Sequence, residues 1–403
     1  MSEIFDPLRA QYTVMMPPRV IFGVDATKQI GTEAKSLFLK KGLIVTDPNL
    51  AKTPLVDRVK KPLQDEGLDV EVYHKIEAEP TDESITEAAK YTKGGDFDFV
   101  VGLGGGSSMD HAKSIAASLT NSAPINEYLA GTKTLEKPAV PIFTVPTTAG
   151  TGAEITEYAV FAVKETMVKS YLYSRFIQPS VAIVDPLMSM TMPPKLTAST
   201  GVDALCHATE SIMSNQANPI TIPLALQATR LISSNLRTAF YQGNNLEARR
   251  NMALGALIGP FSEKNALDVE AHAIGHMIGP LYKQPHGIAC GLTLPYVMEH
   301  NLPVIPEKLR MIAEAMGEDI HGVSLREAGY RAVYAVKHLL EDLKLPLSMK
   351  EIGVQKDDIQ KLADLEMSNP GLTPFHPLLN VKPTKETYVQ LLTKIWQGDL
   401  GKS

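Results

Sequence analysis

The sequence has only two cysteines, Cys206 and Cys290, among its 403 residues. Two cysteines are too few for a disulfide framework, and such scarcity is typical of proteins in a reducing compartment. It also excludes a zinc site built mainly from thiolates. Any metal must therefore rest on nitrogen and oxygen ligands.

The chain also lacks an excess of basic residues and long apolar runs. It has 39 Lys and Arg against 45 Asp and Glu, which gives a formal net charge of -6. Nucleic acids and anionic membranes attract basic surfaces, so we expect neither as a partner. No window approaches the roughly 20 apolar residues of a membrane span, and the first residues carry no apolar stretch of signal-peptide length. The sequence thus predicts a soluble cytoplasmic protein.

Short β-branched segments alternate with helical patterns in the first half of the chain. This alternation favours a parallel sheet with flanking helices. After Asp185 the pattern becomes helical, without a convincing strand. Because the length suggests two domains, we predict an α/β domain over residues 1–188 and an all-helical domain over residues 189–403. The predicted strands are 19–22, 43–47, 69–73, 97–103, 141–145 and 180–185.

A glycine-rich turn, Gly104-Gly105-Gly106-Ser107-Ser108, directly follows the strand predicted at 97–103 and opens a helix. Glycines let the backbone approach a ligand closely, and the start of a helix attracts a phosphate. The spacing differs from the usual Gly-x-Gly-x-x-Gly fingerprint. A packing turn without a ligand is therefore an equal alternative on this evidence.

Two further strand ends support a dinucleotide site. A loop with Thr147, Thr148 and Thr151 follows the strand at 141–145, and its hydroxyls could donate to a pyrophosphate or a nicotinamide amide. Asp47 ends the strand at 43–47, where a carboxylate could bond a ribose 2′-hydroxyl and repel a 2′-phosphate. The alternatives are a solvated turn for the threonines and ordinary turn chemistry for Asp47, which precedes a proline.

Histidines and one aspartate recur at helical spacing in the second half. Asp203 and His207 are one turn apart, His272 and His276 repeat that spacing, and His286 follows in a Pro-His-Gly turn. Imidazoles with one carboxylate suit iron or zinc. Either pair alone could be an ordinary i,i+4 contact, but two pairs and a turn histidine together favour a metal site.

With these motifs the sequence resembles the iron-containing (group III) alcohol dehydrogenase family, from about residue 19 to about residue 363. The resemblance implies the dehydroquinate synthase-like fold: a nucleotide-binding α/β domain, an all-helical domain and a cleft between them. The motifs that carry it are Gly104-Gly105-Gly106-Ser107, Pro146-Thr147-Thr148-Ala149-Gly150-Thr151, Gly201-Val202-Asp203-Ala204 with Glu210, and His272-x-x-x-His276 with Pro285-His286-Gly287.

The resemblance also implies roles for individual residues. Fe(II), with Zn(II) as a competitor, would be bound by Asp203, His207, His272 and His286. His276 would lie close to the nicotinamide, and a dimer or larger homo-oligomer is expected. The positions that match dinucleotide contacts, with NAD preferred over NADP, are Asp47, Gly105, Gly106, Ser107, Ser108, Asp110, Thr147, Thr148, Thr151 and Lys169.

The predicted reaction is hydride transfer between a small alcohol or aldehyde at the metal and C4 of the nicotinamide, with His276 as the proton relay. Relatives on the same framework remain alternatives: a zinc glycerol dehydrogenase, a maleylacetate reductase or a dehydroquinate-synthase-like lyase. From other classes, a metallohydrolase without nicotinamide and a nucleotide-binding regulatory protein also remain open. Four departures from the family pattern leave the substrate open: Glu79, Glu157-Tyr158, Asp268-Val269-Glu270 and residues 367–383.

Overall fold

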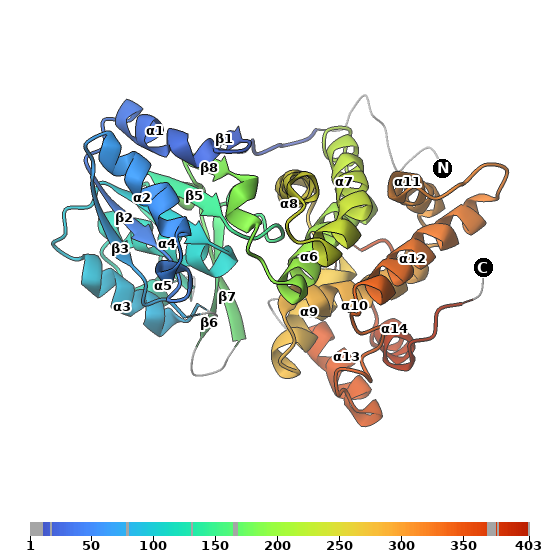
Figure 1. Ribbon diagram of the computed structural model, residues 1–403. Helices are drawn as coiled ribbons and strands as arrows, with labels where there is room; N and C mark the ends of the chain where they lie inside the picture. Colours follow the sequence, from blue (N-terminus) through green and yellow to red (C-terminus); the bar gives the residue numbers. More distant parts are fainter. Residues whose placement is uncertain are drawn as a thin grey trace.

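The computed structural model shows two parts side by side, one built on a sheet and one entirely helical (Figure 1). The side chain of Lys169, which is predicted to contact the dinucleotide, lies outside the described part of the structure. Glu79 and much of the stretch 367–383 lie outside it as well. The structure describes residues 11–16, 18–77, 80–129, 132–163, 168–368, 376 and 379–401, with side chains for all of these except 162, 163, 168 and 169.

The first part is built on a sheet of six parallel strands in the order β1-β8-β5-β4-β2-β3. Parallel pairing puts the carboxyl ends of all six strands at one edge of the sheet. The strands are β1 (Arg19–Phe22), β2 (Lys41–Val45), β3 (Asp69–Tyr73), β4 (Phe99–Gly104), β5 (Ile142–Pro146) and β8 (Val181–Val184).

Helices cover both faces of this sheet. Because side chains alternate along a strand, Ile44 and Val101 belong to one apolar core and Leu43 and Val100 to another. The first core includes residues of α1 and α2, and the second includes residues of α3, α4 and α5. The bounds are α1 (Ile30–Ser36), α2 (Leu55–Asp65), α3 (Asp82–Thr92), α4 (Gly106–Thr120) and α5 (Ile125–Leu129).

An antiparallel hairpin that the sequence analysis missed projects from the sheet part. It consists of β6 (Tyr158–Val163) and β7 (Val168–Tyr173), which pair from Tyr158 with Tyr173 to Val163 with Val168. In Figure 1 it lies on the side of the sheet part that faces the helices. The hairpin therefore belongs to the region between the two parts.

The second part is a bundle of helices around one large apolar core, without a strand among its described residues. The short 3-10 turn Pro186–Ser189 connects it to β8. Its helices are α6 (Pro194–Met213), α7 (Thr221–Tyr241), α8 (Leu246–Ala266), α9 (Glu270–Leu281), α10 (His286–Asn301), α11 (Pro306–Met316), α12 (Leu325–Asp342), α13 (Ile359–Ser368) and α14 (Lys385–Gln397).

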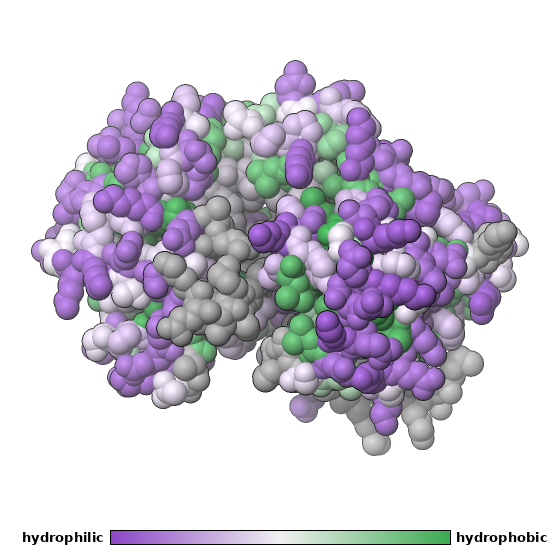
Figure 2. Space-filling model, turned by 90° about the horizontal axis from the view of Figure 1, so that it is seen from below, coloured by the Kyte–Doolittle hydropathy of each residue, from purple (hydrophilic) through white to green (hydrophobic). Residues whose placement is uncertain are grey.

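The predicted class, a parallel α/β part followed by a helical part, is confirmed, and all six predicted parallel strands are present. On the face that Figure 2 shows, the described residues of both parts are mainly polar, and an indentation lies between the parts. Among the described helices, none is long and apolar enough to cross a lipid bilayer.

Candidate active site

Three loops of the predicted dinucleotide site meet at the carboxyl edge of the sheet. The strands β2, β4 and β5 are neighbours, so the segments that follow them, with Asp47, Gly105 and Thr147, lie next to one another. The Thr147 amide donates to the Gly104 carbonyl over 2.9 Å. Ligands of open α/β sheets bind in this location.

The glycine-rich turn requires its glycines for a steric reason. Gly104 has a φ of 147°, and a Cβ there would lie 2.3 Å from the Ser108 Oγ. Helix α4 starts directly after the turn, with Gly105 at its N-cap and no side chain capping it. The turn therefore presents backbone and the positive end of a helix dipole at the edge of the sheet, which suits a phosphate.

The threonine loop touches both parts of the molecule. On the sheet side, a Cβ on Gly105 would lie 3.4 Å from Thr148 Cγ2, and a Cβ on Gly106 would lie 3.2 Å from Thr151. On the helical side, a Cβ on Gly150 would lie 2.7 Å from the Thr200 carbonyl oxygen on α6. The loop thus joins the predicted dinucleotide site to the helices that carry the predicted metal ligands.

Other predicted cofactor residues have structural partners of their own. Asp47 Oδ1 accepts hydrogen bonds from the amides of Asn49 and Leu50, at 2.8 and 3.0 Å. Asp110 is buried, and its Oδ2 accepts from the Val160 amide of β6 at 3.1 Å. Binding roles for Asp47, Asp110, Ser107 and Ser108 stay predictions.

Three helices bring the predicted metal ligands together. Asp203 and His207 lie on α6, His272 on α9, and His286 is the first residue of α10. The start of α10 can approach α6 only because residue 287 is glycine: a Cβ on Gly287 would lie 2.1 Å from the Ser199 carbonyl oxygen and 2.8 Å from Asp203 Cβ.

The donor atoms converge on Asp203. Its Oδ1 lies 3.9 Å from His272 Nε2 and 3.7 Å from His286 Nε2. Metal–ligand bonds of about 2.1 Å in a tetrahedral site put neighbouring ligand atoms roughly 3.4 Å apart. The observed distances are close to that spacing, so these three donors fit one metal ion.

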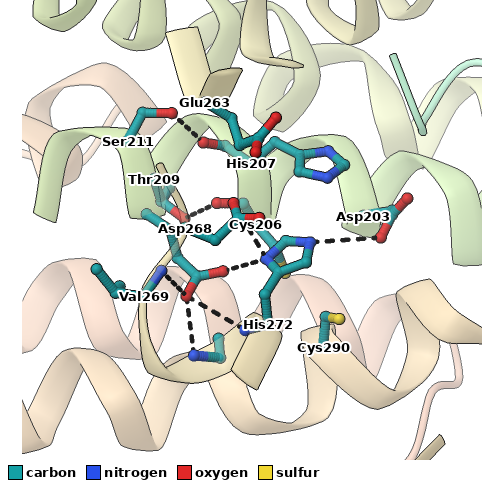
Figure 3. Close-up of polar contacts among 12 residues, drawn as sticks. Asp203, Cys206, His207, Thr209, Ser211, Glu263, Asp268, Val269, His272 and Cys290 are labelled. Atoms are coloured by element: carbon teal, nitrogen blue, oxygen red, sulfur yellow. Dashed lines mark hydrogen bonds and ion pairs between the residues drawn. The ribbon is translucent and has the colours of Figure 1, made fainter. Parts of the chain in front are cut away.

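His207 lies against the face of the His272 ring (Figure 3). The two imidazoles stack with their centroids 4.6 Å apart, and His207 groups with His272 and Asp268 rather than with Asp203 and His286. No hydrogen bond reaches His207 Nδ1 from the described residues. Burial lowers the pKa of His207 well below its usual range, with a smaller effect from His272. A neutral buried imidazole with an unused nitrogen fits a metal ligand.

Cys290 is a neighbour that the sequence analysis did not consider. Its sulfur lies 3.6 Å from His286 Nδ1 and within the donor group of Asp203, His272 and His286. Burial raises the pKa of the thiol well above its usual range, and Asp203 adds to this. A metal deprotonates a thiol that it binds, so the Cys290 sulfur is a further potential donor beside Asp203, His272 and His286.

Glu210 orients His272, although the predicted site did not include it. Its Oε1 accepts from the amides of Val269, Ala271 and His272 at the start of α9, at 3.2, 2.8 and 3.3 Å. Its Oε2 bonds His272 Nδ1. A proton held on Nδ1 leaves Nε2 to face Asp203, the arrangement by which carboxylates orient metal-binding histidines.

Buried carboxylates surround this histidine. Burial raises the pKa of Glu210 to about 8 and that of Glu263 to about 7. Burial, followed by the charges of Glu263 and Glu210, raises the pKa of Asp268 well above its usual range. A divalent cation would offset this concentration of negative charge, so the surroundings also fit a metal.

His276 contacts the sheet part directly. Its Nδ1 and the Tyr171 hydroxyl of β7 are 2.9 Å apart. The sequence analysis missed Tyr171 because it missed the hairpin, whose aromatic and β-branched residues were the available signal. The contact places His276 on the boundary between the predicted dinucleotide and metal sites.

A buried ion pair joins the start of the hairpin to α8. Lys264 Nζ lies 2.7 Å from Glu157 Oε2, and both side chains are almost fully buried. The Tyr158 hydroxyl donates to Glu263 Oε2 at 3.2 Å. Glu157 and Tyr158, which depart from the family pattern, therefore form contacts between the two parts.

Comparisons with known proteins agree with this architecture. Residues 17–186 match the family described as iron-containing alcohol dehydrogenase, and residues 197–396 match the C-terminal family of Fe-containing alcohol dehydrogenases. The 1,3-propanediol dehydrogenase of Citrobacter freundii is 38% identical over 360 residues, which cover 89% of this chain and 93% of that protein. The NAD-dependent methanol dehydrogenase of Bacillus methanolicus is 38% identical over 348 residues, which cover 86% and 91%.

A solved structure shows the same fold. The alcohol dehydrogenase from Oenococcus oeni superimposes with a TM-score of 0.90 at 35% identity, covering 96% of this chain and all of the other. Sequence and structure thus agree over both the sheet part and the helical part. The chain belongs to the iron-containing alcohol dehydrogenase family.

Proposed function

We propose that this protein interconverts small alcohols and aldehydes with NAD(H), using Fe(II) held by Asp203, His207, His272 and His286. The observation that carries the proposal is the threonine loop, which contacts the glycine-rich turn on one side and α6 on the other. A dinucleotide on the turn and a metal between α6, α9 and α10 would therefore be neighbours. The alcohol dehydrogenase activity of the family supports the reaction type.

The choice of metal and cofactor rests on the donor set and the relatives. When bound, a divalent metal supplies Lewis acidity and the dinucleotide supplies a hydride acceptor or donor. Imidazoles with one carboxylate suit Fe(II), and Zn(II) can compete. The methanol dehydrogenase relative is NAD-dependent, and Asp47, at the end of β2, supports NAD because its charge would repel a 2′-phosphate.

His276 is the proposed proton relay. An imidazole can accept and donate a proton near neutral pH. The Tyr171 hydroxyl lies 2.9 Å from His276 Nδ1, so we propose that His276 Nε2 accepts and donates the substrate's proton. Tyr171 would hold the ring in the orientation that this exchange needs.

Reconstitution tests the metal and the cofactor. Protein purified without oxygen and stripped of metal would be reloaded with Fe(II) or Zn(II), and oxidation of NADH or NADPH would be followed with short aldehydes and diols. We expect Fe(II)-dependent turnover with a preference for NADH. Turnover of an ester or phosphate without a dinucleotide would instead favour the metallohydrolase alternative.

The variant His276→Gln tests the relay, and His321→Gln, at an exposed position, is the matched control. We expect the first to lower turnover and change its pH profile while bound metal stays constant. Unchanged turnover and pH profile in His276→Gln would remove the proposed role.

Three broader predictions accompany this proposal. A domain boundary near residue 188 is supported by the turn Pro186–Ser189, which separates the last strand from α6. A homodimer or larger homo-oligomer and a cytoplasmic location, both expected from the sequence, stay predictions. Size-exclusion chromatography with light scattering would test the assembly.

A further inference from the structure

A buried histidine joins the helix of the glycine-rich turn to its neighbour α3. His111 lies on α4, one turn after Ser107, and its exposed fraction is 0%. Its Nδ1 lies 2.8 Å from the Ser107 carbonyl oxygen, and its Nε2 lies 2.9 Å from the Ser84 hydroxyl of α3. The imidazole therefore connects the first turn of α4 to the first turn of α3.

The Ser107 carbonyl determines which nitrogen of His111 carries the proton. A carbonyl oxygen can only accept a hydrogen bond, so Nδ1 donates to it, and Nε2 of the neutral ring is left as an acceptor. Burial lowers the pKa of His111 below its usual value, which favours the neutral ring. The Ser84 hydroxyl then donates to Nε2. Both nitrogens of the ring are therefore used in this connection.

Ser84 also closes the N-terminal end of α3. The Thr81 amide donates to Ser84 Oγ over 3.0 Å, and the Ser84 amide donates to Thr81 Oγ1 over 3.1 Å. The Ser84 hydroxyl also lies 2.8 Å from the Thr81 carbonyl oxygen, so its single proton is shared between that oxygen and His111. Thr81 Oγ1 donates in turn to Glu77 Oε2 over 2.8 Å. Through Ser84, the imidazole thus reaches the loop that enters α3.

The starts of both helices lie at the carboxyl edge of the sheet. Helix α3 follows β3 and α4 follows β4, and the two helices pack together over one face of the sheet. The strand β2, which ends just before Asp47, lies between β4 and β3. A dinucleotide at Gly105 and Asp47 would therefore be bordered by the glycine-rich turn and by the loop that enters α3.

The separation of these two borders matters for binding. Groups that bind a ligand must be held to within about 0.5 Å by side chains whose own positions are fixed. The N-cap of α4 is Gly105, which has no side chain to anchor the turn. A buried imidazole with a hydrogen bond at each nitrogen is a side chain of the required kind.

We propose that His111 is a positioning residue for the dinucleotide. It holds the first turn of α4 against the loop that enters α3, so that the two borders of the dinucleotide site stay at a fixed separation. This inference rests on the proposed function, because a dinucleotide must bind at the glycine-rich turn. It predicts an effect on dinucleotide affinity and none on the step at the metal, whose proposed ligands lie in the helical part.

Three variants separate this role from a general effect on folding. His111→Asn keeps an amide nitrogen near the position of Nδ1, so it can still donate to Ser107, but it is too short to reach Ser84. His111→Gln places its amide near the position of Nε2 and can still bond Ser84. Ser114→Ala is the matched control, because Ser114 is buried on the same helix and its hydroxyl donates to the Asp110 carbonyl oxygen at 2.8 Å.

Binding of NADH to the full-length proteins would be followed by nicotinamide fluorescence, without substrate. We expect the dissociation constant to rise about fivefold in His111→Asn, which corresponds to the loss of one hydrogen bond, and to stay unchanged in His111→Gln and Ser114→Ala. Turnover at saturating NADH should be equal in all four proteins, while KM for NADH follows the dissociation constant. Equal dissociation constants in His111→Asn and Ser114→Ala would overturn the proposal, as would a lower turnover with unchanged NADH affinity.

Ser84→Ala tests the same contact from the other side, and it replaces His111→Asn if circular dichroism shows that His111→Asn does not fold. We expect a similar rise in the dissociation constant, and no further rise in the double variant, because both changes break one contact. Factors that multiply in the double variant would show that the two residues act separately, against the proposal. If the unmodified protein binds no NADH, the proposed function fails as well; if it binds NADH and His111→Asn binds it equally well, only the positioning role fails.

Discussion

Replacing Gly287 with alanine should disrupt the predicted metal site without removing any ligand. The added Cβ would lie 2.1 Å from the Ser199 carbonyl oxygen and 2.8 Å from Asp203 Cβ. Separations below 3.0 Å essentially never occur, so α10 would have to move about 0.9 Å from α6 at this point. His286 precedes the substituted residue and would move with it.

A shift of this size is large for a metal site. Metal–ligand distances hold within about 0.2 Å, and a misplacement of about 1 Å can lower turnover about 100-fold. We therefore expect Gly287→Ala to lose at least about tenfold in metal affinity and about 100-fold in turnover.

The matched control is Gly279→Ala on α9, where the new Cβ would make ordinary contacts at 3.5 Å with Ala289 and the Gln284 carbonyl oxygen. Metal content after dialysis and NADH oxidation would be measured for both variants, with circular dichroism to show that both are folded. If Gly287→Ala retains metal and turnover at the level of Gly279→Ala, the close approach of α10 to α6 does not position the ligands.

Two further predictions concern single side chains. Tyr171→Phe removes the hydroxyl that contacts His276. It should lower turnover about fivefold, which corresponds to the loss of one hydrogen bond of roughly 1 kcal/mol. The control Tyr173→Phe, at an exposed position on the same strand, should have no effect, and equal turnover in the two variants would contradict the positioning role of Tyr171. Burial raises the pKa of Glu154 from its usual value of 4.5 to about 7, so the folded protein favours the protonated acid and loses stability as the pH rises through that range. Glu154→Gln cannot ionise, so its unfolding free energy should rise relative to that of the unmodified protein by up to about 3 kcal/mol between pH 4.5 and pH 7. Urea denaturation of both proteins across this range would measure the difference. A difference in unfolding free energy that stays constant with pH would contradict the shifted pKa.

The parallel sheet could be predicted from the sequence because its signal is local. Strands such as Phe99–Gly104 are continuous apolar runs followed by turn residues, and each was found within a few residues of its bounds. The hairpin Tyr158–Val163 with Val168–Tyr173 was missed because a search for alternating strands and helices does not look for an antiparallel pair. Its aromatic and β-branched composition carried the signal.

Part of the candidate site could likewise be predicted from the sequence, and part could not. His272 and His276 could be grouped because they lie on one helix, four residues apart. By contrast, the position of His207 beside Asp268 depends on how α6 packs against the start of α9, and the contact between Tyr171 and His276 depends on how the hairpin packs against α9. Contacts of that kind join distant segments, and the spacing of residues in one sequence does not encode them.

The buried ion pair between Glu157 and Lys264 has a consequence for how the dinucleotide comes and goes. Removing one partner would leave the other charge buried and unpaired, which costs about 3–5 kcal/mol. The Tyr171–His276 contact and the packing of Gly150 on α6 join the two parts at further points. Because these contacts hold the hairpin region and the threonine loop against the helices, we expect the proposed dinucleotide to enter and leave by movements of the loops at the sheet edge.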